Sequence, residues 1–148
     1  MLSTIARIFF GFIGAALTTY VIGVVLNAQF VIGAHGVPVS IGDRLSMTAF
    51  DISNMTLYLI IIAIALALGF VVAAILKRVL PSLASIAYPL AGAAAIATTL
   101  GLMYMMFQTV PISGARGLFG FAAQVLAGGL GGWVFGKILN RNQRAITA

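Results

Sequence analysis

The sequence predicts an all-α integral membrane protein with four transmembrane helices. Of 148 residues, 62% are hydrophobic and 7% are charged, whereas soluble domains carry about a quarter charged residues. Eight basic and two acidic residues could not keep the surface of a soluble domain of this size in water. Intrinsic disorder requires low hydrophobicity, so it is excluded as well.

Uncharged stretches long enough to cross a bilayer divide the chain, and they are Ile8–Gly42, Ile52–Leu76, Val79–Ala115 and Gly117–Gly136. A spanning helix needs about 20 mostly apolar residues, and each of the two longer stretches ends in a segment rich in Pro, Gly and Ser. We therefore expect spans near residues 7–30, 54–77, 82–108 and 116–138. A β-barrel would show alternating polarity, which the run at 59–66 lacks.

A further short helix is predicted in the first outer loop, before the second span. Ser40 and Asp43 have the spacing of a capping box, which marks a helix start. Apolar and polar side chains then alternate at helical spacing, and the expected apolar stripe is Ile41, Leu45, Thr48 and Ile52. The prediction is an amphipathic helix that lies at the membrane interface.

The basic residues predict the orientation. Four spans place six of them on one side of the membrane, namely Arg7, Lys77, Arg78, Lys137, Arg141 and Arg144. The other side holds Arg44 and Arg116 with both acids, Asp43 and Asp51. By the positive-inside rule we expect both termini in the cytoplasm of a multi-pass protein of the bacterial inner (plasma) membrane. This sorting accounts for the net charge of +6, so we expect no nucleic-acid partner.

We expect one transmembrane domain over residues 1–148, with a possible tandem hairpin repeat of 1–78 and 79–148. The loops starting at Val37 and Val110 share the pattern Val-Pro-aliphatic-Ser. Coincidence remains the alternative, because the flanking helices align poorly and Val, Pro, Ser and Gly are ordinary loop formers.

Small residues line one face of two helices. The first span carries Gly11, Ala15, Thr19 and Gly23, and the last carries Gly120, Gln124, Gly128, Gly132 and Gly136 beside Ala123, Ala127 and Gly131. Glycine costs about 1 kcal/mol in a helix, so such a ridge needs a compensating contact. Packing inside the bundle, an interface with another chain and a pore lining are the alternatives.

The sequence offers little chemistry. No ionisable residue falls within the middle of a span, which argues against a proton-coupled transporter. The chain has no cysteine and one histidine, His35, so we predict no catalytic, cofactor-binding or metal-binding residue. Arg116 begins the predicted last span, where its charge opposes the helix dipole. We therefore expect ion pairing on the outer face among Asp43, Asp51, Arg44 and Arg116, with an aspartate contacting Arg116.

Three segments, Gly42-Asp43-Arg44-Leu45, Pro111–Arg116 and Gln124–Gly132, resemble those of an uncharacterised family of small four-helix bacterial inner-membrane proteins. The resemblance covers most of the chain and brings no activity. We expect a non-enzymatic assembly or accessory subunit that packs on itself or on another membrane protein through glycine-rich faces. The alternatives are a passive carrier or channel for a small neutral or apolar solute, lined by Thr18, Thr98 and Gln124, and an outer-face lipid-modifying enzyme using His35 and Asp43.

Overall fold

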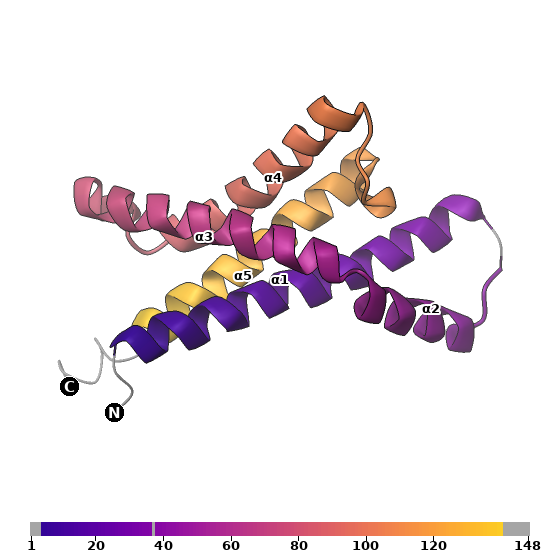
Figure 1. Cartoon of the computed structure of the whole chain (residues 1–148), viewed down its shortest axis with the longest axis horizontal. Coiled ribbons are helices and arrows are strands. Elements are labelled where there is room, and N and C mark those ends of the chain that lie inside the picture. Colours follow the sequence, from indigo (N-terminus) through magenta and orange to yellow (C-terminus); the bar gives the residue numbers. More distant parts are fainter. Residues whose placement is uncertain (1–3, 37, 141–148) are drawn as a thin grey trace.

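The computed structural model describes residues 4–36 and 38–140, which are helical almost throughout (Figure 1). The helices are α1 (Thr4–His35), α2 (Ile41–Asn54), α3 (Thr56–Val79), α4 (Ala87–Phe107) and α5 (Leu118–Asn140), with short 3₁₀ turns η1 (Pro81–Leu83) and η2 (Ser113–Ala115). Four of them, α1, α3, α4 and α5, are long and apolar enough to cross a membrane. The predicted all-helical fold with four candidate spans is confirmed, and it indicates a multi-pass membrane protein.

Three of the predicted helix boundaries are wrong by two to five residues. The first helix continues past residue 30 to His35. The third predicted span, which is α4, begins at Ala87 and not at residue 82, since Pro81–Leu83 forms a 3₁₀ turn. Arg116 does not begin the last helix, because its N–H closes the η2 turn on the carbonyl of Ser113 and α5 starts at Leu118.

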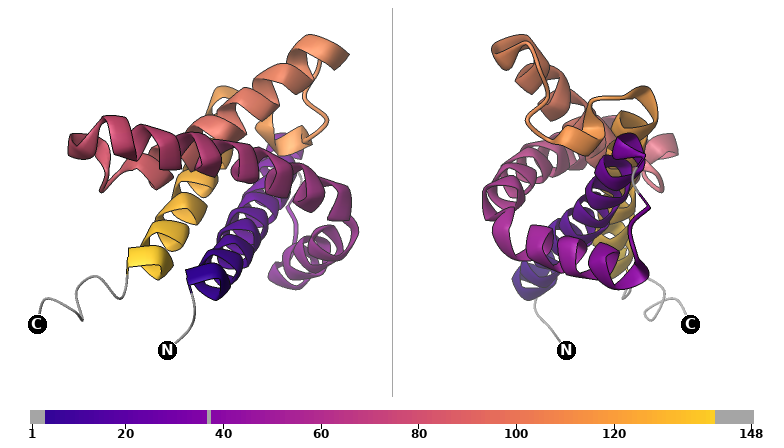
Figure 2. Two further views of the ribbon diagram at one scale, coloured as in Figure 1. Left: turned by 60° about the vertical axis from the view of Figure 1, so that its left-hand side comes forward. Right: turned by 90° about the vertical axis from the view of Figure 1, so that its right-hand side faces the viewer.

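The antiparallel helices α1 and α5 lie side by side and form the centre of the bundle (Figures 1 and 2). Helix α4 packs on α5, and α3 packs on both α4 and α1. The described start of α1 and the described end of α5 lie at the same end of the bundle. The second half of α4 diverges from the α1–α5 pair, as Figure 1 shows.

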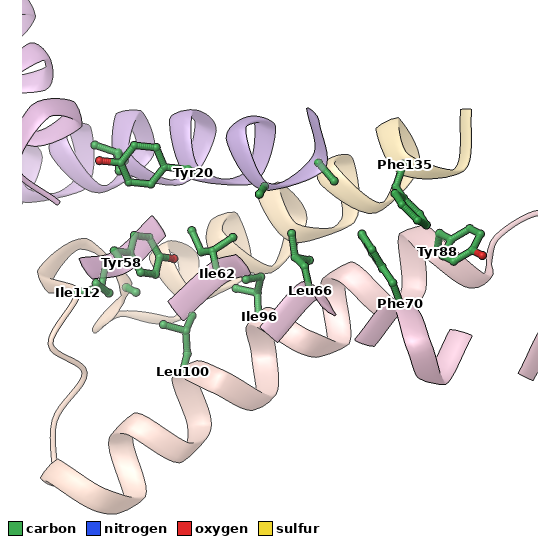
Figure 3. Close-up of a cluster of buried hydrophobic side chains, with 14 of the residues drawn as sticks. Tyr20, Tyr58, Ile62, Leu66, Phe70, Tyr88, Ile96, Leu100, Ile112 and Phe135 are labelled. Atoms are coloured by element: carbon green, nitrogen blue, oxygen red, sulfur yellow. The ribbon is translucent and has the colours of Figure 1, made fainter. Parts of the chain in front are cut away.

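An apolar core fills the space between α3, α4 and the central pair (Figure 3). The large side chains Ile62, Leu66, Ile96 and Leu100 are at most 1% exposed, although they come from only two helices. Since α1 and α5 contribute mainly small residues at their contact, the bulky residues of α3 and α4 supply the volume that the core needs.

A cluster of three aromatic rings closes the core at the end that holds the described termini of α1 and α5. Phe70 stacks on Phe135 at a centroid distance of 4.4 Å, and Tyr88 meets Phe135 edge to face at 4.8 Å. Such pairs contribute about 0.5–1.5 kcal/mol beyond the area they bury. The cluster therefore joins α3, α4 and α5 where the loop between α3 and α4 is short.

Helix α2 begins directly after Ser40, where the capping-box spacing predicts a helix start. The Ser40 hydroxyl accepts a hydrogen bond from the Asp43 N–H at 3.1 Å and donates to the Asp43 carboxylate at 2.6 Å. The apolar stripe expected on this helix is split, however. Ile41 and Leu45 are 79% and 66% exposed, while Thr48 and Ile52 are half-buried on the side of α1.

Candidate functional site

The small-residue face of α5 packs against α4. A Cβ added at Gly132 would strike the backbone carbonyl of Tyr88, and one added at Gly128 would meet the Gly92 carbonyl oxygen at 2.5 Å. These neighbours are backbone atoms, which cannot rotate away as a side chain could. Close approach of the two helices therefore requires glycine at these positions.

The adjoining side of α5 packs against α1 in the same way. A Cβ at Gly131 would strike the Thr19 hydroxyl and lie 2.7 Å from the Ala15 carbonyl oxygen. Nearer the termini, a Cβ at Gly11 would lie 3.3 Å from the Phe135 ring. Thr19 also donates a long hydrogen bond to the Ala127 carbonyl at 3.4 Å.

The glycine ridge is thus enclosed by the chain itself. The residues expected to form it are buried or half-buried, and they are Gly120, Gln124, Gly128, Gly132 and Gly136 on α5 with Gly11, Ala15 and Gly23 on α1. The sequence left open whether this ridge faces inward or outward, and the structure places it inward. An assembly surface for another chain has to lie elsewhere on the molecule.

A buried amide joins three helices in the middle of this contact. Gln124 of α5 is 1% exposed, and its Nε2 donates to the Gly23 carbonyl of α1 at 2.8 Å. Its Oε1 accepts from the Tyr58 hydroxyl of α3 at 2.9 Å. Both ends of the amide therefore bond to protein groups, so burying it leaves neither the amide nitrogen nor the amide oxygen unpaired.

A second buried amide ties α2 to the turn η2. Asn27 of α1 is 6% exposed, and its Oδ1 accepts from the Gly114 N–H of η2 at 2.7 Å. Its Nδ2 donates to the Asp51 carboxylate of α2 at 3.4 Å. A Cβ at Gly114 would lie 2.7 Å from the Asn27 backbone, so glycine is needed for this approach. Asn27 therefore connects α2 and η2 through α1.

Further hydrogen bonds hold α2 along the side of α1. The Tyr20 hydroxyl donates to the Ile52 carbonyl at 2.6 Å. Arg44 donates from Nη1 to the Gln29 side-chain oxygen at 3.0 Å, and Gln29 donates to the Thr48 hydroxyl at 3.3 Å. The face of α2 that meets α1 is therefore its polar face, and this explains why Ile41 and Leu45 are exposed.

The expected ion pair between Arg116 and an aspartate is not formed within residues 4–36 and 38–140. Arg116 is exposed, and its Nε donates to the Val110 carbonyl at 3.0 Å. Asp43 is engaged with Ser40, and Asp51 accepts from Asn27. The Asn27 amide joins α2 to η2 instead, because it bonds to the Asp51 carboxylate and to the Gly114 N–H.

The residues proposed for a solute path do not share one lining. Gln124 is buried, Thr18 is half-buried and Thr98 is exposed. The residues proposed for an outer-face enzyme each bond locally: His35 Nδ1 pairs with the Val31 carbonyl at 2.8 Å, and Asp43 pairs with Ser40. The part of the chain that the structure describes contains no group of three or more His, Cys, Asp or Glu placed to hold a metal ion.

The two loops of the possible repeat differ in structure. Ser40 caps the 14-residue helix α2, whereas Ser113 begins the three-residue turn η2. Ile112 is buried in the core, whereas the equivalent Val39 is half-buried, and the two prolines, Pro38 and Pro111, are both exposed. Three residues used in the sequence interpretation, Val37, Arg141 and Arg144, lie outside the described residues.

Sequence reasoning assigned no partner to three polar side chains that bond to other helices or turns here, Tyr20, Asn27 and Tyr58, or to the Gly114 N–H. The available signal was the presence of an asparagine within a long apolar segment, since an amide in such a segment requires a partner. The identity of that partner, 87 residues further along the chain, follows only from the fold.

No family model matches this chain, and neither the curated proteins nor the solved structures contain a match to it. The resemblance to small four-helix bacterial inner-membrane proteins therefore stays a prediction.

Proposed function

We propose that this chain is a non-enzymatic multi-pass protein of a bacterial inner membrane, which acts as an assembly or accessory subunit. The observation that carries the proposal is the closed polar interior: Gln124 and Asn27 are almost completely buried, and their amides bond to protein groups. A solute path or an active site needs polar groups that are free to meet a substrate. A sealed interior leaves the outer surface of the bundle as the place where it acts.

The diverging half of α4 supplies that surface. The last four side chains of this half are 57% to 75% exposed, and they are Tyr104, Met105, Met106 and Phe107. Methionine is flexible and polarisable, so it adapts to a partner surface. This segment replaces the glycine ridge, which the chain uses internally, as the proposed contact with a second copy or another membrane protein.

The proposed orientation places both termini in the cytoplasm. Lys77 and Lys137 lie in the last turns of α3 and α5. Figure 1 shows these two helix ends on the same side of the bundle as the described start of α1. Both acids, Asp43 and Asp51, belong to α2, which lies toward the opposite end. This sorting supports the positive-inside orientation.

Single-cysteine crosslinking in native membranes tests the assembly proposal, because the chain has no cysteine of its own. Met106→Cys should give crosslinked species, either a dimer of this chain or a larger adduct. The matched control is Leu68→Cys on α3, which is 67% exposed and should give far less product. The proposal would be contradicted if both cysteines are labelled equally but neither forms crosslinks, and if the purified protein is a monomer in mild detergent.

A flux assay in liposomes tests the passive-carrier alternative. Reconstituted protein should leave the permeability to small neutral solutes such as glycerol unchanged. Flux that rises with protein content and falls in Gln124→Leu would show that the interior opens, and it would refute a role confined to the outer surface.

A further inference from the structure

A hollow between the start of α4 and the end of α5 lies at the end of the bundle that carries Lys77 and Lys137. Its volume is about 570 Å³, and it is lined by the short α3–α4 connection and both helices: Ser85, Tyr88, Pro89, Trp133, Gly136, Lys137, Ile138 and Asn140. Because both helices cross the membrane, a hollow at their ends opens at the height of the lipid headgroups. Its occupant therefore has to suit both the aqueous border and the acyl region.

The cations near this hollow have aromatic rings as neighbours instead of carboxylates. The Lys137 ammonium lies 5.1 Å from the centre of the Trp133 ring, and the Lys77 ammonium lies 4.7 Å from that of Tyr88. Both aspartates of the chain lie on α2, toward the opposite end. Neither aspartate therefore neutralises the positive charge at the hollow, and an anionic ligand would complement it.

Tyr88, whose ring is largely buried, also lines the hollow. Tyr88 is 6% exposed, and no hydrogen bond of the described residues involves its hydroxyl. Figure 3 shows the ring at the edge of the aromatic cluster, with the hydroxyl directed away from Phe70 and Phe135. The hydroxyl is therefore available as a donor, and a phosphate oxygen is a strong acceptor for it. The first turn of α4, which no side chain caps, adds partial positive charge at the same place.

An exposed apolar track leads from the hollow into the membrane. On α5, Leu126, Leu130 and Trp133 follow at spacings of four and three residues, and their exposed fractions are 68%, 48% and 52%. A free phosphate would use only the charged end of this arrangement. A phospholipid would place its headgroup in the hollow and an acyl chain along the track.

We propose that this hollow is a binding site for an anionic phospholipid of the leaflet next to the chain termini. The headgroup phosphate accepts hydrogen bonds from Tyr88 and Ser85 and pairs with Lys137, while Lys77 adds a second charge. Tryptophan is a typical border residue at this depth, and Trp133 packs against the glycerol region. The site lies at the opposite end of α4 from the surface proposed for assembly, so either proposal can fail without the other.

Trp133 is the only tryptophan of the chain and lies in the hollow, so its fluorescence reports on the site directly. The experiment titrates the purified full chain in mixed micelles with phosphatidylglycerol or phosphatidylcholine that carries brominated acyl chains, which quench tryptophan. We expect phosphatidylglycerol to quench at a mole fraction at least about fivefold lower than phosphatidylcholine, since one basic residue near an anionic lipid gives about that factor.

Two variants test which residues give the preference for phosphatidylglycerol over phosphatidylcholine. Lys137→Gln and Lys77→Gln should each reduce the preference about fivefold. The cation–π contact of Lys77 is with Tyr88, so its removal leaves the Lys137 contact with the Trp133 probe in place. The control Arg116→Gln removes a cation at the opposite end and should leave the preference unchanged. Circular dichroism checks that each variant keeps its helical content.

Equal quenching by the two lipids would overturn the proposal, as would an equal loss of preference in the Arg116 control. Inorganic phosphate added to the micelles separates a lipid from a free anion. If it displaces brominated phosphatidylglycerol at matched ionic strength, the site recognises free phosphate and the lipid assignment is wrong. If sodium chloride at the same ionic strength and phosphate have the same small effect, the lipid assignment stands.

Discussion

Replacing Gly132 by alanine should destabilise the bundle, because this glycine lies against the backbone of α4. The added Cβ would strike the Tyr88 carbonyl oxygen and lie 2.7 Å from the Tyr88 carbonyl carbon and 3.0 Å from the Pro89 Cα. None of these atoms belongs to a flexible side chain, so α4 and α5 have to separate. Overpacking of this kind costs about 1–3 kcal/mol.

Gly101→Ala is the matched control for this substitution. Gly101 lies within α4, and an added Cβ there would meet nothing within 4 Å. Alanine favours a helix by about 1 kcal/mol over glycine at either position, so this contribution cancels when the variants are compared. The difference between Gly132→Ala and Gly101→Ala is therefore the packing cost, and we expect about 1–3 kcal/mol.

The assay is equilibrium unfolding by sodium dodecyl sulfate in mixed micelles, followed by circular dichroism, with the oligomeric state measured by light scattering. Gly132→Ala should unfold at a lower detergent fraction than Gly101→Ala, with the oligomeric state of both unchanged. Identical unfolding curves would refute the packing argument. An altered oligomeric state with unaltered unfolding would show that the ridge contacts another chain.

Three further substitutions test the polar contacts in the same unfolding assay. Asn27→Leu leaves the buried Gly114 N–H without its acceptor and should cost about 1–3 kcal/mol of unfolding free energy. The control Asn54→Leu, at an exposed position, should cost clearly less. Equal losses would contradict the contact between Asn27 and Gly114. Tyr58→Phe removes the hydroxyl that donates a hydrogen bond to Gln124 and should cost about 0.6–1.7 kcal/mol of unfolding free energy. Tyr104→Phe, on the exposed half of α4, should leave the stability unchanged. An unchanged stability in Tyr58→Phe would mean that the bond to Gln124 contributes nothing. Arg116→Glu should cost no more than about 1 kcal/mol, because Arg116 makes one exposed hydrogen bond to Val110, and Asp51→Arg should not restore the loss; rescue by the charge swap would reveal an ion pair.

The helical spans could be predicted because hydropathy and length alone decide which segments can cross a bilayer. The same holds for the start of α2, where Ser40 and Asp43 are close in sequence and make the predicted cap. Helix ends were harder to place, since Pro81–Leu83 form a 3₁₀ turn before α4 and Arg116 closes the η2 turn instead of starting α5.

The partners of the interior residues could not be predicted from one sequence. The spacing of Gly128 and Gly132 identified a face, but it could not say that the neighbours would be the carbonyls of Gly92 and Tyr88. Likewise, the charge of Arg116 suggested a carboxylate partner, whereas Asp51 is engaged by Asn27. Such pairings depend on how the four helices cross, and sequence periodicity does not contain that information.

The central claim is that the small-residue side of α5 packs on α4 of the same chain, and paired cysteines test it most directly. A Cβ at Gly129 would lie 3.7 Å from the Ala93 Cβ, within the range of about 3.5–4.5 Å that a disulfide needs. The double variant Ala93→Cys with Gly129→Cys should form an intrachain disulfide on oxidation and migrate as a monomer on a non-reducing gel. A disulfide-linked dimer would contradict the claim. So would a dimer formed when the two single variants, Ala93→Cys and Gly129→Cys, are co-expressed.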